Sequence, residues 1–265
     1  VEASESEAAL AAYETLTSIA PEMLEAWVNL GNLHHREKRF TAAAVAYQRV
    51  LDVNPEDAST WSRLGVVADA MGARDEACAH YRMALELDPE CVEAHFNMGI
   101  SLREQGDLTG AIGSYRRALA VNPTQADVLF NLGRAQQADG DVAAAEVSYR
   151  ASISVDPNKV AAQNNLGTVL LDQGQLSDAV DVYRQATGED SAGSVHANSA
   201  WNLSLALLLS GNYEEGWRWY EWRFYKGGAT PPTFDKPRWY LDAPSDARVL
   251  VWAEQGYGDA MQFVR

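Results

Sequence analysis

Glycine, tyrosine and proline each return at intervals of 34 residues along this chain of 265 residues. Three residue types that keep one register indicate a repeated structural unit, and a period of 34 residues is typical of a helix–turn–helix solenoid. The recurring residues are Gly31, Gly65, Gly99, Gly133 and Gly167, then Tyr13, Tyr47, Tyr81, Tyr115, Tyr149 and Tyr183, and finally Pro21, Pro55, Pro89, Pro123 and Pro157.

Each unit, numbered here as repeat positions 1–34 from Leu24, contains the patterns of two helices. Small or apolar residues dominate positions 4, 7, 8 and 11, which form one stripe of a first helix. A second stripe occupies positions 20, 24 and 27, as in Ala111, Tyr115 and Ala118. Glycine at position 8 and alanine at position 20 permit close approach of the two backbones. A single pair cannot bury both faces, so the units must stack.

The connections between the helices carry their own signals. Position 15 is often glycine, which suits the turn inside each pair. Proline at position 32 cannot continue the second helix and biases the preceding residue away from helical geometry. We therefore expect each helix pair to end at its proline.

Applied along the chain, this register divides it into five segments. Residues 1–23 form the second helix of a truncated repeat, 24–193 form five repeats, and 194–226 form a divergent sixth repeat with an aromatic capping helix. Residues 227–247 are a proline-rich connector. Residues 248–265 begin a further domain, with a short strand at Arg248–Ala253. Because both ends interrupt a pattern, we expect a fragment of a longer polypeptide.

Composition narrows the class of partner and the compartment. The net charge of −16 argues against nucleic acid, which requires a basic surface. The mean hydropathy is −0.28 and no apolar run reaches membrane-spanning length, so we expect no membrane insertion. The acidic first residues give no signal-peptide pattern, which favours the cytoplasm. Cys78 and Cys91 are expected to stay reduced.

Repeat position 6 is asparagine in five of six repeats and carries most of the candidate binding residues, to which position 9 adds Asn32. Positions 2, 6, 9 and 13 lie in an arc opposite the buried stripe, and small residues such as Val66 and Ala138 leave a groove there. An asparagine side chain donates and accepts hydrogen bonds, which suits the backbone of an extended peptide. The alternative is that asparagine recurs at this position only because the repeats derive from a common ancestral repeat, without any role in binding. The predicted groove residues are Asn29, Asn32, Arg63, Asn97, Asn131, Asn165 and Asn202.

Residues 24–225 resemble tetratricopeptide repeats (TPR), which implies an all-α, right-handed superhelical solenoid of antiparallel helix pairs. The row of asparagines at position 6 is similar to the asparagine ladder of O-linked N-acetylglucosamine transferases. In those enzymes the ladder holds the substrate polypeptide in the inner groove. Chaperone-binding TPR domains instead use lysine at position 2 as a carboxylate clamp. This chain has Glu25, Ser59, Glu93 and Asp127 at that position, so an acidic tail would be repelled.

The C-terminal segments resemble the junction of bacterial TPR–glycosyltransferases. The succession 211–217, 220–224, 237–239 and 254–259 is similar to the place where repeats lead into a two-Rossmann (GT-B) domain. That resemblance makes Gly256, Gly258 and Asp259 a possible substrate loop.

The resemblance and the repeats leave two hypotheses open. One is the acceptor-binding arm of a bacterial glycosyltransferase; the other is a free-standing scaffold for protein assembly. No nucleophile–base pair is evident, and the adjacent His34 and His35 have no spaced partners, so we expect no catalytic residue, metal or cofactor in these residues.

Overall fold

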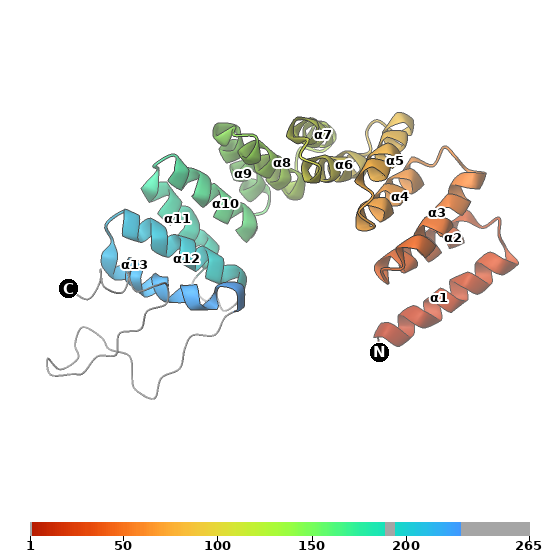
Figure 1. Cartoon of the computed structure of the whole chain (residues 1–265), viewed down its shortest axis with the longest axis horizontal. Helices are drawn as coiled ribbons and strands as arrows, with labels where there is room; N and C mark the ends of the chain where they lie inside the picture. Colours follow the sequence, from red (N-terminus) through yellow and green to blue (C-terminus); the bar gives the residue numbers. More distant parts are fainter. Residues whose placement is uncertain (1, 189–193, 229–265) are drawn as a thin grey trace.

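The computed structural model describes residues 2–188 and 194–228 of the chain. Within these ranges the chain forms consecutive helix pairs that stack into an arch, with α1 at one end and α12 and α13 at the other (Figure 1). No β-strand occurs in the described ranges, which confirms the predicted all-α solenoid of helix pairs. No helix in these ranges is long and apolar enough to span a membrane.

The helices alternate between the first and second members of each pair. The first helices are α2 (Leu24–Arg36), α4 (Ala58–Ala70), α6 (Val92–Glu104), α8 (Ala126–Ala138), α10 (Val160–Asp172) and α12 (Ser194–Leu209). The second helices are α1 (Glu2–Ile19), α3 (Phe40–Val53), α5 (Arg74–Leu87), α7 (Leu108–Val121), α9 (Val142–Val155), α11 (Leu176–Thr187) and α13 (Tyr213–Tyr220). A 3₁₀ helix, η1 (Glu221–Gly228), follows α13.

A glycine packed on a tyrosine ring forms the centre of each of the five pairs from α2–α3 to α10–α11. A Cβ atom added to Gly99 would lie 2.5 Å from the Cε1 atom of Tyr115, and the other four glycines at position 8 meet their tyrosines in the same way. These tyrosines are at most 2% exposed. The 34-residue spacing therefore reflects a close-packed contact between the two helices of a pair.

The turns inside the pairs explain the glycine at position 15. Gly72, Gly106, Gly140 and Gly174 have φ between 76° and 88°, a region that residues with a Cβ rarely adopt. Lys38 occupies the same position in the first pair with φ of 58°. Each turn therefore requires a residue in the left-handed conformation, and in the first pair this residue is a lysine.

The first helices are buried on a wider face than the predicted stripe. Positions 3 and 10 are also buried, including Thr60, Val67 and Val169. The prediction was incomplete because each first helix packs against its own partner and also against the preceding pair. Its buried arc therefore exceeds a single i, i+3, i+4, i+7 stripe.

The aromatic segment after Gly211 differs from the single helix that the sequence suggested. The α-helix ends at Tyr220 and the chain continues as η1. The Tyr220 ring packs against the rings of Trp201 of α12 and of Trp217, with centroid-to-centroid distances of 4.9 Å and 5.1 Å. The predicted connector from residue 229 onward, the Arg248–Ala253 strand, and Gly256, Gly258 and Asp259 lie outside the described residues.

Candidate peptide-binding surface

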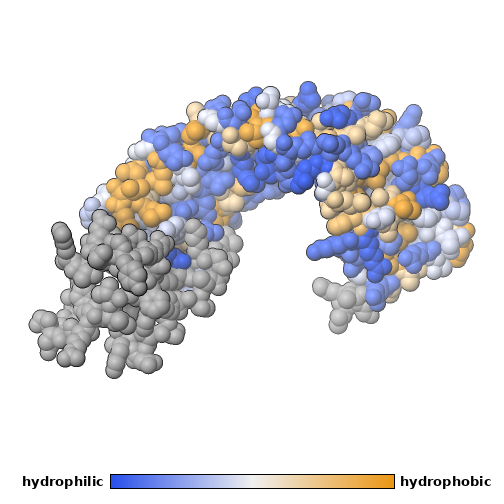
Figure 2. Space-filling model, viewed as in Figure 1, coloured by the Kyte–Doolittle hydropathy of each residue, from blue (hydrophilic) through white to orange (hydrophobic). Residues whose placement is uncertain are grey.

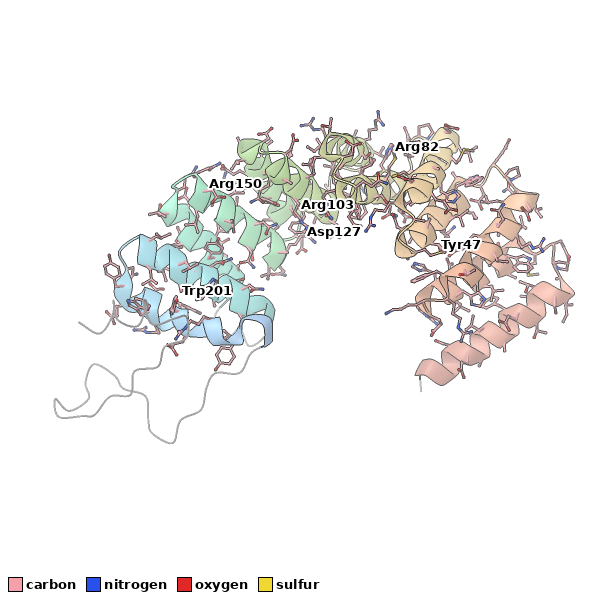
Figure 3. All side chains as sticks on the ribbon, in the orientation of Figure 1. Tyr47, Arg82, Arg103, Asp127, Arg150 and Trp201 are labelled. Carbon is pink, nitrogen blue, oxygen red and sulfur yellow. The ribbon has the colours of Figure 1, made fainter. Side chains whose placement is uncertain are left out.

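The first helices present their exposed positions to the inner side of the arch. Figure 3 places Arg103 of α6 and Asp127 of α8 on the inner edge, whereas Arg82 of α5 and Arg150 of α9 lie on the outer edge. The space-filling view is hollowed on this inner side, and hydrophilic residues line its middle part (Figure 2). We call this surface the concave surface.

The residues predicted to line a groove are all accessible. Asn29 and Asn32 are exposed, and Arg63, Asn97, Asn131, Asn165 and Asn202 are half-buried. The side chains of Asn29 and Asn97 make no hydrogen bond to the described part of the chain. These two amides therefore keep their donors and acceptor for a ligand.

Other members of this row are partly engaged by the scaffold. The Asn131 side-chain amide donates to the Asp127 carbonyl at 2.9 Å, and that of Asn165 donates to the Tyr149 hydroxyl at 3.3 Å. Arg63 donates to the Ser59 hydroxyl at 2.7 Å. In the two asparagines the side-chain amide nitrogen is used internally while the oxygen accepts no hydrogen bond from a described residue. The row therefore combines structural contacts with available acceptors.

The buried tyrosines reach the same surface through their hydroxyl groups. Tyr47 donates to Asn32 at 2.7 Å, Tyr81 to Asp69 at 2.8 Å and Tyr149 to Gln137 at 2.8 Å. The Tyr183 hydroxyl lies 3.1 Å from that of Thr168. Burial raises the pKa of Tyr47 to about 12, and the nearby charge of Arg63 opposes this shift. Each hydroxyl is thus tied to the first helix of its own pair.

The central repeat breaks this pattern. The buried hydroxyl of Tyr115 has no hydrogen-bond partner within the described ranges, because the nearby first-helix positions hold Ile100 and Arg103, which offer no side-chain acceptor. The Nε atom of Arg103 is also buried without a partner. Burial raises the pKa of Tyr115, whereas the close approach of the Arg103 side chain to the hydroxyl and the positive charges of Arg103 and Arg134 lower it. The middle of the concave surface is therefore rich in donors and poor in acceptors.

Aromatic rings that the sequence did not predict as part of the site lie on both sides of this central part. Phe96 and Phe130 are half-buried at position 5 of consecutive repeats, with ring centroids about 6 Å from those of Tyr115 and Tyr149. The Arg134 guanidinium lies 5.7 Å from the Phe130 centroid. The recurrence of phenylalanine at one repeat position was the available signal. Arg134 itself lies at position 9, where mainly small residues were expected.

One acidic residue of position 2, Asp127, is neutralised by an ion pair. Lys159 contacts Asp127 at 2.6 Å and lies 5.8 Å from the Phe130 ring centroid. Glu104 at position 13 is paired with Arg74 at 2.6 Å. These ion pairs offset two carboxylates beside the central part, whereas Glu93 at position 2 makes no ion pair with a described residue.

No metal centre is formed by the described residues, since no group of three or more potential ligand side chains gathers there. His34 is buried, which lowers the pKa of its imidazole, and its neighbour His35 packs on Phe40 instead. Cys78 and Cys91 are free thiols. The possible substrate loop at residues 256–259 lies outside the described residues and stays a prediction.

Comparison with protein families identifies the repeated unit. Tetratricopeptide repeat models match residues 24–57, 58–91, 130–194 and 164–221, and a TPR repeat model matches residues 101–140. The chain belongs to the tetratricopeptide repeat family. The TPR matches cover the glycine–tyrosine contacts of four helix pairs and the C-terminal part of the α6–α7 pair. No curated protein sequence matches this TPR protein.

Solved TPR structures share the fold. MamA is 25% identical, with a TM-score of 0.56, and the match covers 59% of this chain and 92% of MamA. YrrB, described as a TPR protein with an unusual peptide-binding site, is 20% identical with a TM-score of 0.59, covering 68% of this chain and 92% of YrrB. PilF of Pseudomonas aeruginosa is 20% identical with a TM-score of 0.66, covering 78% of this chain and 94% of PilF.

Proposed function

We propose that this TPR protein binds an extended segment of a partner protein along its concave surface. The observation that carries the proposal is the row at position 6, in which Asn29 and Asn97 have unused amides and Asn131 and Asn165 have unused oxygens. Amides at a regular spacing pair with a peptide backbone largely regardless of its sequence. The proposed binding requires no cofactor. It is also compatible with the predictions that the protein binds no nucleic acid and does not insert into a membrane.

The central part of the surface adds a preference for an acidic residue in the bound segment. Arg103 and Arg134 lie beside the Tyr115 hydroxyl, which has no acceptor among the described residues. A carboxylate accepts hydrogen bonds from guanidinium groups in fixed geometry. Phe96 and Phe130 supply apolar surface on either side for the neighbouring side chains of the segment.

The test uses peptides selected from a random displayed library against the wild-type protein. The double variant Asn97→Ala/Asn131→Ala is expected to weaken their binding about tenfold, while stability changes by less than about 1 kcal/mol because the sites are accessible. The matched control is Gln48→Ala/Gln185→Ala, which removes two exposed amides from second helices. Equal affinity of the wild type and the Asn97/Asn131 variant would overturn the proposal.

The second candidate function is the acceptor-binding arm of a bacterial glycosyltransferase. It rests on the succession of motifs at 211–217, 220–224, 237–239 and 254–259, of which the last two lie outside the described residues. Under this alternative the concave surface would hold the acceptor polypeptide. The intact mass of the native polypeptide tests it: a chain longer by about 250–300 residues leaves room for two further domains, and a chain ending near Arg265 excludes them.

A further inference from the structure

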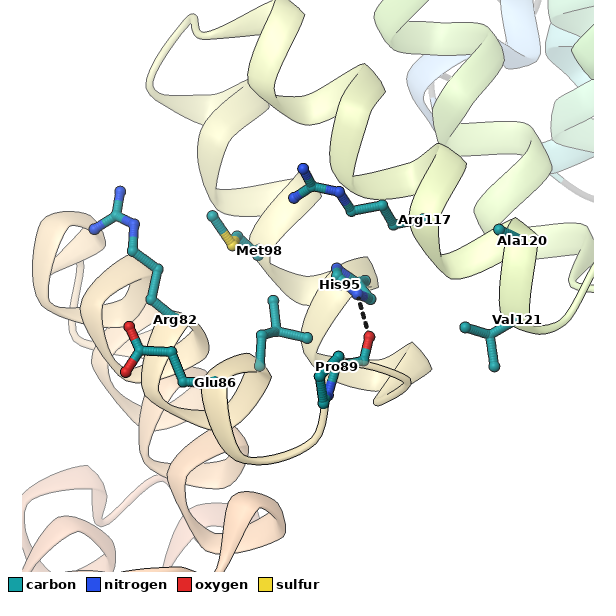
Figure 4. A pocket seen from close by; sticks show the side chains of 9 residues that line it. Arg82, Glu86, Pro89, His95, Met98, Arg117, Ala120 and Val121 are labelled. Atoms are coloured by element: carbon teal, nitrogen blue, oxygen red, sulfur yellow. Dashed lines mark hydrogen bonds between the residues drawn. The ribbon is translucent and has the colours of Figure 1, made fainter.

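A pocket of about 560 Å³ opens between the second helices α5 and α7, away from the concave surface. Figure 4 shows α6 as its floor, with His95 at the centre. Its apolar walls come from both flanking helices and from the connection before α6. The lining residues are Arg82, Leu85, Glu86, Pro89, His95, Met98, Arg117, Ala120 and Val121.

The residue at repeat position 4 explains why there is space here. In the two preceding repeats this position is tryptophan, and Trp27 and Trp61 donate their indole N–H to Pro21 at 3.0 Å and Pro55 at 2.9 Å. His95 makes the same contact, from Nε2 to the Pro89 carbonyl at 2.9 Å (Figure 4). An imidazole keeps the hydrogen bond but lacks the six-membered ring of the indole. The third repeat is therefore anchored as the first two are, with one aromatic ring fewer.

The second repeat shows what occupies the corresponding place. The Trp61 ring lies 5.5 Å from the His80 ring of α5, centroid to centroid, and so covers the region between α3 and α5. Among the described residues that line the pocket, His95 is the one aromatic ring, and Met98 and Leu85 add apolar lining. Aromatic side chains bury a large apolar area for little conformational entropy, so a flat ring is the ligand group that this shape favours.

The charged side chains at the rim of the pocket indicate which group of a ligand would lie next to such a ring. Arg82 and Arg117 lie at the rim, and neither makes an ion pair with a described residue, although the chain carries a net charge of −16. Glu86 lies on the same helix as Arg82, one turn away, so its carboxylate partly offsets that guanidinium (Figure 4). Arg117 is placed on the opposite side, near His95 and Met98 (Figure 4). Arg117 is therefore the group available to a carboxylate.

We propose that this pocket is a second binding site, which takes an aromatic side chain of a partner protein while an adjacent acidic residue of that partner pairs with Arg117. The site opens between second helices, with α6 beneath it, whereas the concave surface is formed by the exposed face of the first helices. A partner held here leaves the concave surface accessible, so one chain can join two protein segments. This site stands on its own observations and does not depend on peptide binding in the concave surface.

The test uses the peptide acetyl-Trp-Glu-amide as the probe and ¹³C-methyl labelling of methionine as the readout. The chain has five methionines, and Met98 lines the pocket while the exposed Met71 and Met83 are not among its lining residues. Saturable shifts of the Met98 signal are expected, with Met71 and Met83 unmoved. A dissociation constant of about 1 mM corresponds to about 4 kcal/mol and is measurable in this way. No shift of Met98 at saturating peptide would overturn the proposal.

The substitution His95→Trp fills the pocket with the side chain that the first two repeats already use. It keeps an N–H for the Pro89 carbonyl and removes the buried His95 Nδ1, which has no partner. Binding of the probe should fall at least tenfold. Gln163→Trp, the same replacement at the same position of the fifth repeat, is the matched control and should bind as the wild type does. Undiminished binding by the His95 variant would place the probe elsewhere and reject the site.

The acidic part of the proposal has its own variant. Arg117→Gln should weaken acetyl-Trp-Glu-amide about fivefold and leave acetyl-Trp-Gln-amide unchanged, because only the first peptide offers a carboxylate. Equal loss for both peptides would reject the charge pairing. The Asn97→Ala/Asn131→Ala variant should retain the Met98 shift. A loss of binding at the concave surface can therefore be distinguished from a loss of binding in the pocket.

Discussion

The side-chain amide of Gln163 donates a hydrogen bond to the carbonyl oxygen of Pro157, 2.9 Å away. Trp27, Trp61 and His95 make the same contact with Pro21, Pro55 and Pro89. Three chemically different side chains thus supply one N–H donor at repeat position 4. The contact ties the first helix of each repeat to the turn that precedes it, and the proline has no N–H of its own to contribute.

Loss of this donor should cost stability. Gln163→Leu is expected to lower the free energy of unfolding by about 1 kcal/mol, the typical net value of one hydrogen bond. The fourth repeat has Leu129 at this position, so leucine itself fits the site. Gln163→Trp keeps the donor and should be more stable than the leucine variant. Urea denaturation followed by circular dichroism decides this, and equal stability of the two variants would contradict the assignment.

The left-handed turn of the first pair offers a stabilising substitution. Lys38 has φ of 58° where the following four repeats have glycine. Because a Cβ is disfavoured in that region, Lys38→Gly should raise the free energy of unfolding by about 1 kcal/mol. Gly72→Lys is the reverse change at the same position of the next repeat and should lower it by a similar amount. The pair of thermal melts tests both signs at once.

The contact between Gly99 and Tyr115 predicts opposite effects for two glycine-to-alanine changes in one repeat. Gly99→Ala adds a methyl group 2.5 Å from the Tyr115 ring, which should cost about 1–3 kcal/mol through overpacking. Gly113→Ala adds one in a helix where no atom lies within 4 Å, and it should gain about 0.5–1 kcal/mol from helix propensity. If Gly99→Ala also stabilised the protein, the close packing would be wrong.

Alkaline pH should unfold the protein through its buried tyrosines. Burial raises the pKa of Tyr47 to about 12, and the pKa values of Tyr81, Tyr149 and Tyr183 are raised as well. The unfolded chain releases these protons near pH 10, so stability is complete below pH 10 and is lost as the pH rises toward 12. Each tyrosine should contribute a slope of about 1.4 kcal/mol per pH unit.

Urea denaturation at several pH values between 9 and 12 measures this slope. Tyr47→Phe should reduce it by the share of one tyrosine, while the free energy at neutral pH falls because the hydrogen bond to Asn32 is lost. Tyr213→Phe, at an exposed tyrosine, is the control for the substitution itself. An unchanged slope in Tyr47→Phe would show that this hydroxyl ionises equally in both states.

Binding in the concave surface should depend on salt if the bound segment is acidic. Arg134→Gln is expected to weaken acidic peptides three- to tenfold and to flatten the dependence of their affinity on ionic strength, because screening over about 8–10 Å acts on the removed charge. Arg49→Gln, on the outer helix α3, is the control. Titration calorimetry at low and high salt provides the comparison, and identical salt slopes would argue against a role of Arg134.

Much of the candidate surface followed from register alone. Position 6 of a first helix lies opposite the buried stripe, so an asparagine there is accessible, and this relation depends only on 3.6 residues per turn. The aromatic and basic members were missed for a different reason. Phe96 and Phe130 contact tyrosines of the second helix of their own pair, and Arg134 lies over the Phe130 ring, so their roles depend on how the two helices of a pair pack.

The sequence by itself determined the helix pairs, their turns and their stacking, because a glycine and a tyrosine 16 residues apart, such as Gly167 and Tyr183, must meet to be buried. Local periodicity also determined which side chains remain accessible. Only the tertiary structure decided which polar groups lack partners, as for the Tyr115 hydroxyl, and where a missing ring leaves a pocket beside His95. Those properties depend on distances between repeats, and the spacing of residues along a chain does not contain those distances.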